Sequence, residues 1–380
     1  MAADLKLFIL AGEASGDRLA AALVHEMKLR QPVRLSGVGG SELAGEGLRS
    51  LFPMEELSVM GFSDVAKRLP RLYWRLGQAA RAALRERPDV VVLVDSQVFS
   101  AELAKRLRRG GYRGAILLYV APAVWAWRPE RAPKLMPLFD EVLSILPFEP
   151  AAMERLGGPR TTYVGHPALA RLPFRPAIPE RGPLLLLPGS RDGEISRTLG
   201  MMRDTALALR DHPRVTSFIL PTTPAQAARL REATTSWPVP VEVLADDAAK
   251  RRAFGAAIAA IAVTGTVTLE LALADVPMAT TYVADAGQVR RFFKYEVKFV
   301  SLPNIILDRP VVPEVLLAAP DAPKLIETIR RVLDGQGVAA AQVAAFAELR
   351  ALMEKGAPEA PLQSAAERVL AHAGNTTPGR

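Results

Sequence analysis

Short runs of apolar residues alternate along this chain with segments of helical spacing. The first thirty residues show the unit: an apolar run over 6–10, a glycine loop over 11–17, and apolar residues at helical spacing over 18–30. Strand-like runs recur at 90–94, 115–120 and 142–146, and a helical stretch over 100–109 follows the first of these. Strands of this kind, alternating with amphipathic helices, predict a parallel sheet covered on both faces.

The same pattern begins again after a proline-rich segment. Four prolines fall between residues 171 and 183, and such a stretch continues neither a helix nor a central strand. Behind it come strand-like runs at 184–187, 215–220, 239–244 and 258–263. An Ala-rich helix over 337–355 and a last helix, with a capping-box pattern from Ser364 to Glu367, end the pattern.

We therefore predict an α/β protein with two Rossmann-like parallel-sheet domains facing each other across a cleft. The predicted boundaries are an N-terminal domain over 1–170, a linker over 171–183 and a second domain over 184–345. The helices of residues 346–380 are expected to pack back towards the N-terminal domain. A length of 380 residues agrees with two domains of ordinary size.

Composition excludes several classes of site. The chain has no Cys, which excludes disulfides, thiolate metal sites and a cysteine nucleophile, and its four His are far apart in sequence. The longest apolar run, over 115–127, is interrupted by Pro122 and is shorter than the roughly 20 residues of a membrane span. The first residues do not resemble a signal peptide. We expect a cytoplasmic protein that can touch a membrane from outside.

The charge of the chain points to an anionic partner. Lys and Arg number 48 against 40 Asp and Glu, a net charge of +8. Nucleic acid, a phosphorylated ligand and an acidic membrane surface all fit this excess. No aromatic-rich nucleic-acid motif accompanies it, so a nucleic-acid binder is the least favoured of the three.

Two turns in the second half suit a nucleotide diphosphate. After the run at 184–187, Ser190 and Arg191 offer a hydroxyl and a guanidinium at the start of a helix, where backbone N–H groups attract anions. After the run at 258–263, Gly265 and Thr266 form a second small turn, and Glu270 can accept hydrogen bonds from ribose hydroxyls. Each turn, taken alone, has an equally good structural explanation. The first can be an ordinary β–α turn with a solvated Arg, and the second a Thr N-cap with a Glu that complements the helix dipole. Two such turns at one sheet edge favour the nucleotide.

The first half offers carboxylates instead. The loop of Glu13 and Ser15 also contains Asp17, and its negative charge suits hydroxyls or a base better than a phosphate; Asp17 can simply cap its own helix. Asp95 ends a buried strand, where partial burial would raise the pKa of a general base. A strand-end Asp that caps the next turn is the competing interpretation.

Basic and aromatic residues are interleaved at two places. The segment 60–87 has seven basic and two acidic side chains, and 290–295 repeats the mixture. Basic helices with exposed aromatics are typical of membrane-surface contacts, although most charge runs are only solvated faces. Two Trp residues of the loop 124–128 are expected to pack at a domain interface. The membrane-facing candidates are Phe62, Arg68, Arg71, Tyr73, Trp74, Arg291 and Phe292.

Motifs along residues 6–320 resemble those of bacterial lipid-A-disaccharide synthases. They occur in the family's order: Ala11-Gly-Glu-Ala-Ser-Gly-Asp17, Met54-Glu-Glu-Leu-Ser-Val-Met-Gly61, Val124-Trp-Ala-Trp-Arg128, Leu146-Pro-Phe-Glu149, Val164-Gly-His-Pro167, Leu187-Pro-Gly-Ser-Arg191, Thr264-Gly-Thr-Val-Thr-Leu-Glu270 and Ser301-Leu-Pro-Asn304. The resemblance implies an inverting glycosyltransferase of the two-Rossmann (GT-B) type. It also implies a UDP-sugar-binding second domain and a first domain that faces acceptor and membrane.

The resemblance assigns roles to individual positions. Asp95 matches the family's proposed general base, and the two turns and Glu270 match its diphosphate and ribose contacts. Glu13 and Asn304 match polar residues of the substrate site. The implied substrates are UDP-2,3-diacylglucosamine and 2,3-diacylglucosamine 1-phosphate, at the inner membrane, with no cofactor or metal. The oligomeric state stays open.

Two departures and two alternatives accompany the resemblance. Asp95 is followed by Ser-Gln-Val-Phe, where the family usually has a Pro-Asp-Phe segment, and Ile258 replaces an acidic residue. The first alternative is another GT-B enzyme of UDP-sugars, with a different acceptor or with 2-epimerase activity. The second is a non-enzymatic binder of RNA or anionic lipid.

Overall fold

The computed structural model describes residues 4–57, 62–172, 175, 177–285, 287–290, 297–335 and 337–374, and the side chains of 62–68 lie outside this description. The chain forms two compact units. Unit 1 comprises Met1–Pro167 and Lys355–Arg380, and unit 2 comprises Ala168–Glu354. In the described part of the chain, no helix combines the length and the apolar character needed to cross a bilayer.

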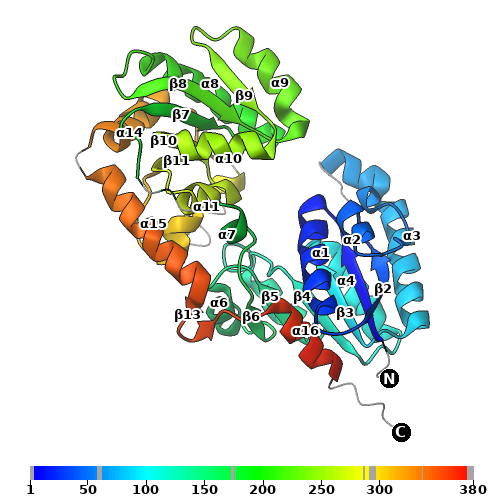
Figure 1. Ribbon diagram of the computed structural model, residues 1–380. Helices are drawn as coiled ribbons and strands as arrows, with labels where there is room; N and C mark the ends of the chain where they lie inside the picture. Colours follow the sequence, from blue (N-terminus) through cyan, green and yellow to red (C-terminus); the bar gives the residue numbers. More distant parts are fainter. Residues whose placement is uncertain are drawn as a thin grey trace. The chain divides into compact units, whose positions relative to one another are not determined.

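Unit 1 is built on a six-stranded parallel sheet in the order β2-β1-β3-β4-β5-β6 (Figure 1). Its strands are β1 (Leu5–Ala11), β2 (Val33–Val38), β3 (Val90–Val94), β4 (Ala115–Tyr119), β5 (Glu141–Ser144) and β6 (Thr161–Tyr163). Its helices are α1 (Ala14–Lys28), α2 (Ser41–Gly45), α3 (Phe62–Glu86), α4 (Gln97–Arg109), α5 (Ala132–Leu135), α6 (Glu149–Arg155) and α16 (Ala365–Gly374).

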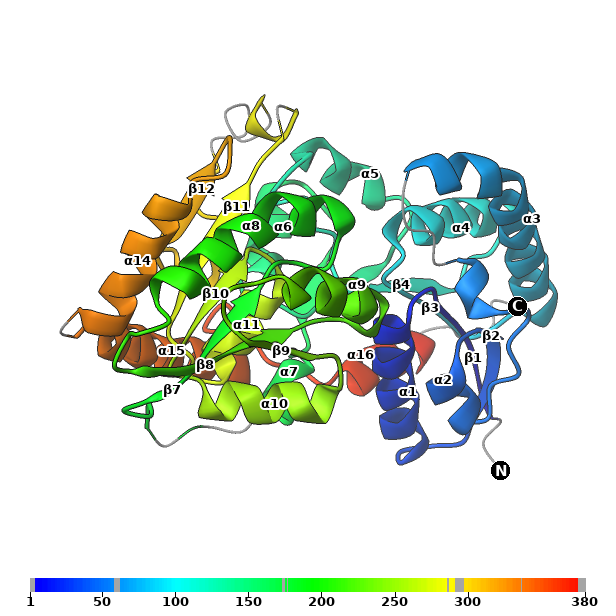
Figure 2. The same cartoon turned by 90° about the horizontal axis from the view of Figure 1, so that it is seen from above.

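Helices cover both faces of the unit 1 sheet. All five residues of β3 and of β4 are buried, as the unbroken apolar runs predict for central strands. Helices α1 and α16 lie on one face, and α3 and α4 lie on the other (Figure 2). The core of the unit therefore consists of two apolar layers, one on each side of the sheet.

Unit 2 repeats this architecture with the strand order β12-β11-β10-β7-β8-β9, and all its neighbouring strands are parallel. Its strands are β7 (Gly182–Leu187), β8 (Val215–Pro221), β9 (Val241–Leu244), β10 (Ala259–Val263), β11 (Met278–Val283) and β12 (Glu314–Leu317). Its helices are α7 (Ala168–Arg171), α8 (Asp192–Ala208), α9 (Pro224–Thr235), α10 (Asp247–Ala256), α11 (Thr266–Leu273), α13 (Leu302–Leu307), α14 (Ala322–Asp334) and α15 (Val338–Lys355). The predicted fold class, two Rossmann-like α/β domains, is confirmed.

The predicted linker is part of unit 2. Arg175 is buried, and its guanidinium donates to the carbonyls of Ala257 (2.6 Å) and Asp275 (2.7 Å). Arg350 of α15 donates to the carbonyl of Leu172 (3.3 Å). These bonds hold the proline-rich segment against unit 2, so the chain enters that unit at Ala168, before the predicted linker begins.

The C-terminal residues are shared between the units, and unit 2 extends past the predicted boundary at 346. Helix α15 belongs to unit 2 as far as Glu354, and only the chain from Lys355 onward returns to unit 1. There α16 packs against α1, β3 and β4. The capping pattern at its start is present, since Ser364 Oγ accepts the N–H of Glu367 (3.1 Å).

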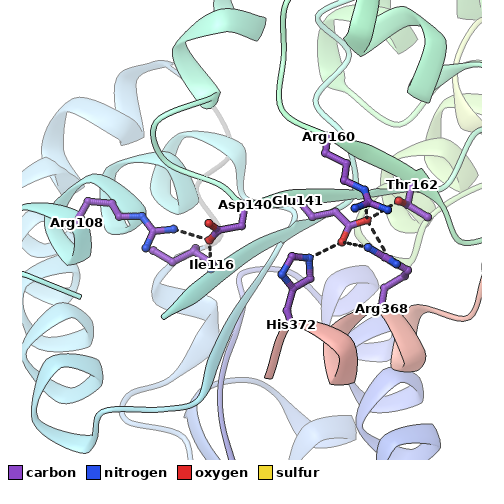
Figure 3. A network of polar contacts seen from close by, with 8 residues as sticks. All are labelled: Arg108, Ile116, Asp140, Glu141, Arg160, Thr162, Arg368 and His372. Carbon is purple, nitrogen blue, oxygen red and sulfur yellow. Dashed lines mark hydrogen bonds and ion pairs between the residues drawn. The ribbon is translucent and has the colours of Figure 1, made fainter. Parts of the chain in front are cut away.

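A buried carboxylate on β5 holds α16 in place (Figure 3). Glu141 is fully buried, and it accepts hydrogen bonds from Arg368 Nη2 (2.9 Å) and Nε (3.1 Å) and from Thr162 Oγ1. His372 Nε2 lies 2.6 Å from Glu141 Oε2, and Arg160 Nε lies 3.7 Å from Oε1. Burial raises the pKa of Glu141, but the bonds from His372, Arg368 and Thr162 outweigh burial and lower it to about 2.

Candidate active site

The topological switch point of unit 1 lies between β1 and β3. Strand β1 pairs with β2 on one side and with β3 on the other, and the last residues of the second pair, Ala11 and Val94, lie opposite each other. Gly12 and Asp95 therefore begin neighbouring loops at the carboxyl edge of the sheet. Open α/β sheets place their ligand sites at such a point.

Close packing joins these two loops. A Cβ on Gly12 would lie 1.9 Å from Ser96 Oγ, so any larger residue at position 12 would push the loops apart. Glu13 and Ser15 follow Gly12 at the exposed start of α1. The structure thus brings the polar loop of Glu13 next to the loop of Asp95, although the two are far apart in sequence.

The backbone around Asp95 is strained. Asp95 has a φ of +54°, Ser96 +41° and Val120, at the end of the neighbouring strand β4, +81°. Positive φ is unfavourable for residues with a side chain, most of all for a β-branched residue such as Val120, and it persists only where surrounding bonds enforce it. Here the N–H of Asp95 donates to Tyr119 O (2.8 Å), and Ser100 Oγ donates to Asp95 O (2.8 Å). Strain of this kind concentrates at functional sites.

The Asp95 carboxyl group is half-buried at this edge. Burial raises its pKa above the ordinary 3.8, and a hydrogen bond from the N–H of Ser96 only partly offsets this effect. A carboxylate with a raised pKa takes up a proton more readily than a solvated one. The arrangement suits a general base that accepts a proton from a hydroxyl group.

Asp17 has a different role from the predicted one. It is buried, and its carboxylate accepts the N–H groups of Gly40 (2.8 Å), Glu42 (2.9 Å) and Leu43 (3.4 Å). Asp17 therefore caps the N-terminus of α2 and not that of its own helix. It fixes the loop after β2 to α1, a long-range contact that sequence spacing does not show.

Unit 2 has its switch point between β7 and β10. Leu187 and Ala262 pair near the ends of these strands, so the turn after β7 and the turn after β10 lie side by side at the carboxyl edge. The turns of Ser190 and of Gly265, predicted to converge at one sheet edge, are thus neighbours in the structure.

The turn after β7 contains a carboxylate that we did not predict. Glu194 Oε2 accepts the N–H groups of Ser190 (3.2 Å) and Arg191 (3.3 Å), and its Oε1 accepts Arg191 Nη1 (2.7 Å). Gly189 has a φ of +100°, and a Cβ there would lie 2.6 Å from Glu194 Oε2. Glu194 thus occupies backbone donors that we expected to bind phosphate. The contributions of Ser190 and Arg191 are reduced to their side chains, of which that of Arg191 is 82% exposed.

The turn after β10 is open. Gly265 is exposed, and a Cβ there would meet no atom within 4 Å. Thr268 Oγ1 donates to Gly265 O (2.8 Å), and Thr266, the first residue of α11, is exposed. Glu270 is half-buried one turn further, and its pKa is raised by burial, a change that Lys250 counteracts. Glu270 thus lies one helical turn after the open turn of Gly265 and Thr266.

Asn304 supports the fold of unit 2. It is buried, and its amide donates to Val312 O (2.8 Å) and Glu314 Oε1 (2.9 Å) and accepts the N–H groups of Val311 and Val312 (both 2.8 Å). These four bonds use its two donors and its two acceptor positions. The assignment of Asn304 to substrate binding stays a prediction; in this structure its amide uses its hydrogen-bonding capacity on partners within unit 2.

The basic and aromatic candidates lie on α3 as far as the structure describes them. Tyr73 and Trp74 are exposed, with the guanidinium of Arg106 4.1 Å from the first ring and that of Arg75 4.5 Å from the second. Arg71 is exposed beside them. The side chains of Phe62 and Arg68, and both Arg291 and Phe292, lie outside the described residues.

A second buried carboxyl group, Glu149, lies next to the Trp loop. It accepts Trp125 Nε1 (3.2 Å) and the N–H of Leu146 (3.2 Å), and burial raises its pKa to about 8. Trp125 also packs edge-to-face on Phe148, within unit 1. Among the residues that the structure describes, no three acidic or His side chains gather closely enough to hold a metal ion.

Comparison with known proteins bears on the function. Residues 7–367 match the family model described as Lipid-A-disaccharide synthetase. A lipid-A-disaccharide synthase of Rhodopseudomonas palustris (strain BisB18) is 42% identical over 378 residues, which cover 96% of this chain and 95% of the relative. That of Rhodospirillum centenum is 39% identical over 398 residues, which cover 99% of this chain and 98% of the relative.

Solved structures with the same architecture are more distant in sequence. A calicheamicin glycosyltransferase has a TM-score of 0.58 at 17% identity, with 100% of both chains covered. A UDP-GlcNAc 2-epimerase from Neisseria meningitidis, bound to UDP-GlcNAc, has a TM-score of 0.61 at 10% identity, with 91% of this chain and 97% of that one covered. These two show the GT-B fold alone. From the family match over nearly its whole length and relatives near 40% identity, the chain belongs to the lipid-A-disaccharide synthase family of glycosyltransferases.

Proposed function

We propose that this enzyme transfers 2,3-diacylglucosamine from its UDP derivative to 2,3-diacylglucosamine 1-phosphate. The products are a β(1→6)-linked disaccharide 1-phosphate and UDP. One observation carries the proposal: Asp95, with a raised pKa and a strained backbone, stands at the switch point of unit 1. Family membership supplies the substrates.

In the proposed reaction Asp95 acts as general base. The 6-hydroxyl oxygen of the acceptor attacks the anomeric carbon of the donor while its proton passes to the Asp95 carboxylate. The bond between that carbon and the UDP oxygen breaks, and UDP leaves with the bonding electron pair. Attack opposite the leaving group inverts the configuration from α to β.

Unit 2 is proposed to bind the UDP part of the donor. The open turn of Gly265 and Thr266 and the exposed Arg191 guanidinium are suited to the diphosphate, and Glu270 to the ribose hydroxyls. The N-terminus of α11 adds its positive dipole end at this sheet edge, whereas Glu194 already occupies N–H groups at the start of α8. Together these groups stabilise the charge that develops on the leaving diphosphate.

The substrates explain the basic-aromatic helix. Acyl chains keep both sugars in a bilayer, so the enzyme has to work at a membrane surface. The exposed Tyr73 and Trp74 supply rings that can enter the interface, and Arg71, whose side chain is 70% exposed, and Arg106 supply cations that attract anionic headgroups. Arg75, beside Trp74, is held by Glu56. We propose peripheral binding to the cytoplasmic face of the inner membrane through this part of α3.

The direct test is incubation with both substrates followed by mass analysis for the disaccharide 1-phosphate. Asp95→Asn is expected to lower kcat by a factor of about 100 to 10,000, the range for a lost general base, while its affinity for UDP stays within twofold of the parent. Wild-type rates in this variant would remove Asp95 from the mechanism.

Whether UDP release depends on an acceptor distinguishes the proposed transfer from the two alternative activities. UDP release that needs no acceptor would indicate a 2-epimerase. Release that requires an acceptor other than the acylated sugar phosphate would indicate a different transferase with the same fold.

A further inference from the structure

A cavity of about 450 Å³ is lined wholly by residues of unit 1, most of them in α4, in α5 and in the loop between β4 and α5. This volume falls within the range of about 300–1,000 Å³ that is common for small-molecule sites. The wall is formed by the start of α4, the loop after β4, and α5 with the residues that follow it. Its apolar members include Val98, Ala101, Leu118, Val124, Leu135 and Leu138.

Several apolar side chains around this cavity are exposed to solvent. Val98 is 72% exposed and Trp127 40%, and both line the cavity. Met136, which follows the lining residue Leu135, is 57% exposed. An apolar hollow surrounded by exposed apolar side chains is a common mark of a binding site, because burying these surfaces under a ligand is favourable.

Cations line the same cavity. Lys105, Arg131 and Lys134 are among its lining residues, together with one acidic residue, Glu102. Glu102 pairs with Lys105 (3.7 Å). In the described part of the chain, neither Arg131 nor Lys134 forms an ion pair within 4 Å, and their spacing of three residues places them on one side of the helical turn. An apolar hollow with two such cations suits an acyl chain attached to an anionic group.

The position of the cavity relates it to the acceptor. Gln97 and Val98, which line it, form the first turn of α4 directly after Asp95 and Ser96. The acceptor is the substrate whose hydroxyl group Asp95 has to reach. It also carries both chemical features of the cavity, an acyl chain and a phosphate.

We infer that this cavity binds one acyl chain of the acylated sugar phosphate acceptor, with its phosphate at Arg131 and Lys134. The inference rests on the proposed function. It makes the cavity a specificity site for acceptor chain length, since each methylene buried or left out changes affinity by a factor of about four.

The test fills the cavity. Ala101 is half-exposed on α4 and lines the hollow, so Ala101→Trp places a large ring inside it without breaking the helix. The matched control is Ala228→Trp on the exposed face of α9 in unit 2. Initial rates are measured at saturating donor with acceptors of short and long acyl chains.

For the wild type and the Ala228→Trp control, KM for the acceptor is expected to fall as the acyl chain lengthens. Ala101→Trp should raise KM for the long-chain acceptor at least tenfold and change KM for the short-chain acceptor and for the donor less than twofold. KM for the acceptor should then depend little on acyl-chain length. Equal KM values for Ala101→Trp and the control would overturn the inference while the proposed transfer stands. Weaker binding to anionic vesicles with an unchanged acceptor KM would assign the cavity to a bilayer lipid and overturn it too.

The phosphate contact is tested with Arg131→Gln and Lys134→Gln in one chain. This variant should raise KM at least tenfold for the acceptor and less than twofold for its analogue without phosphate; equal effects on both would refute the contact. If the wild type forms no disaccharide, the proposed function fails. In that case, binding to the cavity is measured directly by the displacement of a fluorescent fatty acid by lysophosphatidic acid. If Ala101→Trp abolishes this binding, the cavity binds acyl chains, but the inference that its ligand is the acceptor is refuted.

Discussion

Replacement of Glu141 by Ala tests how the C-terminal helix is held to unit 1. The change removes a fully buried carboxylate that accepts hydrogen bonds from Arg368 and Thr162 and contacts His372. Arg368 and His372 belong to α16 and are themselves mostly buried. Without Glu141, their polar groups stay in the protein interior with no partner there, which is more costly than the loss of an exposed ion pair.

The pKa of Glu141 indicates how much the carboxylate contributes to the free energy of unfolding of unit 1. Burial raises it, but the bonds from His372, Arg368 and Thr162 lower it from 4.5 to about 2, a difference worth about 3 kcal/mol. Because the folded-state pKa is the lower one, this stability is fully present above pH 4.5. It is lost as the pH falls from 4.5 through 2. At neutral pH the Ala variant should therefore lose about 3 kcal/mol, within the range for a broken buried ion pair.

Amide hydrogen exchange followed by mass spectrometry is the suitable assay, because it reports the stability of each segment, whereas a single melting temperature averages over both units. About 3 kcal/mol corresponds to roughly a hundredfold faster exchange in α16 and β5. Peptides from α8 in unit 2 provide the internal reference and should not change.

The matched control is Arg160→Ala. Arg160 contacts the same carboxylate at 3.7 Å, but its side chain is 64% exposed, so its loss should cost less than about 0.5 kcal/mol. If the two variants changed the exchange of α16 equally, the attachment through Glu141 would be disproved. Equal acceleration in α8 would show a global effect and would also contradict the reasoning.

Three further predictions concern unit 1. Asp17→Ala should destabilise the unit by about 2 kcal/mol, since three N–H groups at the start of α2 lose their acceptor; urea unfolding followed by the fluorescence of its Trp residues measures this. Burial raises the pKa of Glu149 to about 8, so between pH 4.5 and 8 the folded state holds a proton that the unfolded state has lost. Stability should thus fall by up to about 1.4 kcal/mol per pH unit as the pH rises, and a slope that persists in Glu149→Gln would contradict this cause. Catalysis needs ionised Asp95, so kcat/KM should fall at low pH, below a pKa higher than 3.8; an acid limb at or below 3.8 would show that burial does not act on it.

The sequence predicts strands well where burial on both faces leaves an unbroken apolar run, as in β3, β4 and β7. It does not reveal β11, which reads Met-Ala-Thr-Thr-Tyr-Val. Thr280 and Thr281 are buried there because their hydroxyls donate to the carbonyls of Pro313 and Val315. Edge strands β2 and β12 are half-exposed and lack the apolar signal as well.

The candidate site shows the same limit. Asp95 could be predicted because a carboxylate directly after a buried strand has a known place at the sheet edge. The role of Glu194 could not be predicted, since its carboxylate turns back onto N–H groups three and four residues earlier, next to a positive-φ turn at Gly189 that sequence spacing does not show. Asn304 carried a motif match, but its partners come from a loop and a strand whose register the sequence does not show.

The return of the chain from unit 2 to unit 1 has a consequence for synthesis. Because residues 365–374 follow the whole of unit 2 along the chain, unit 1 cannot be completed before unit 2 has been synthesised. Until then Glu141 has neither Arg368 nor His372 beside it, and the apolar face that α16 covers is open to water. Synthesis of unit 1 thus starts before that of unit 2 and is completed after it.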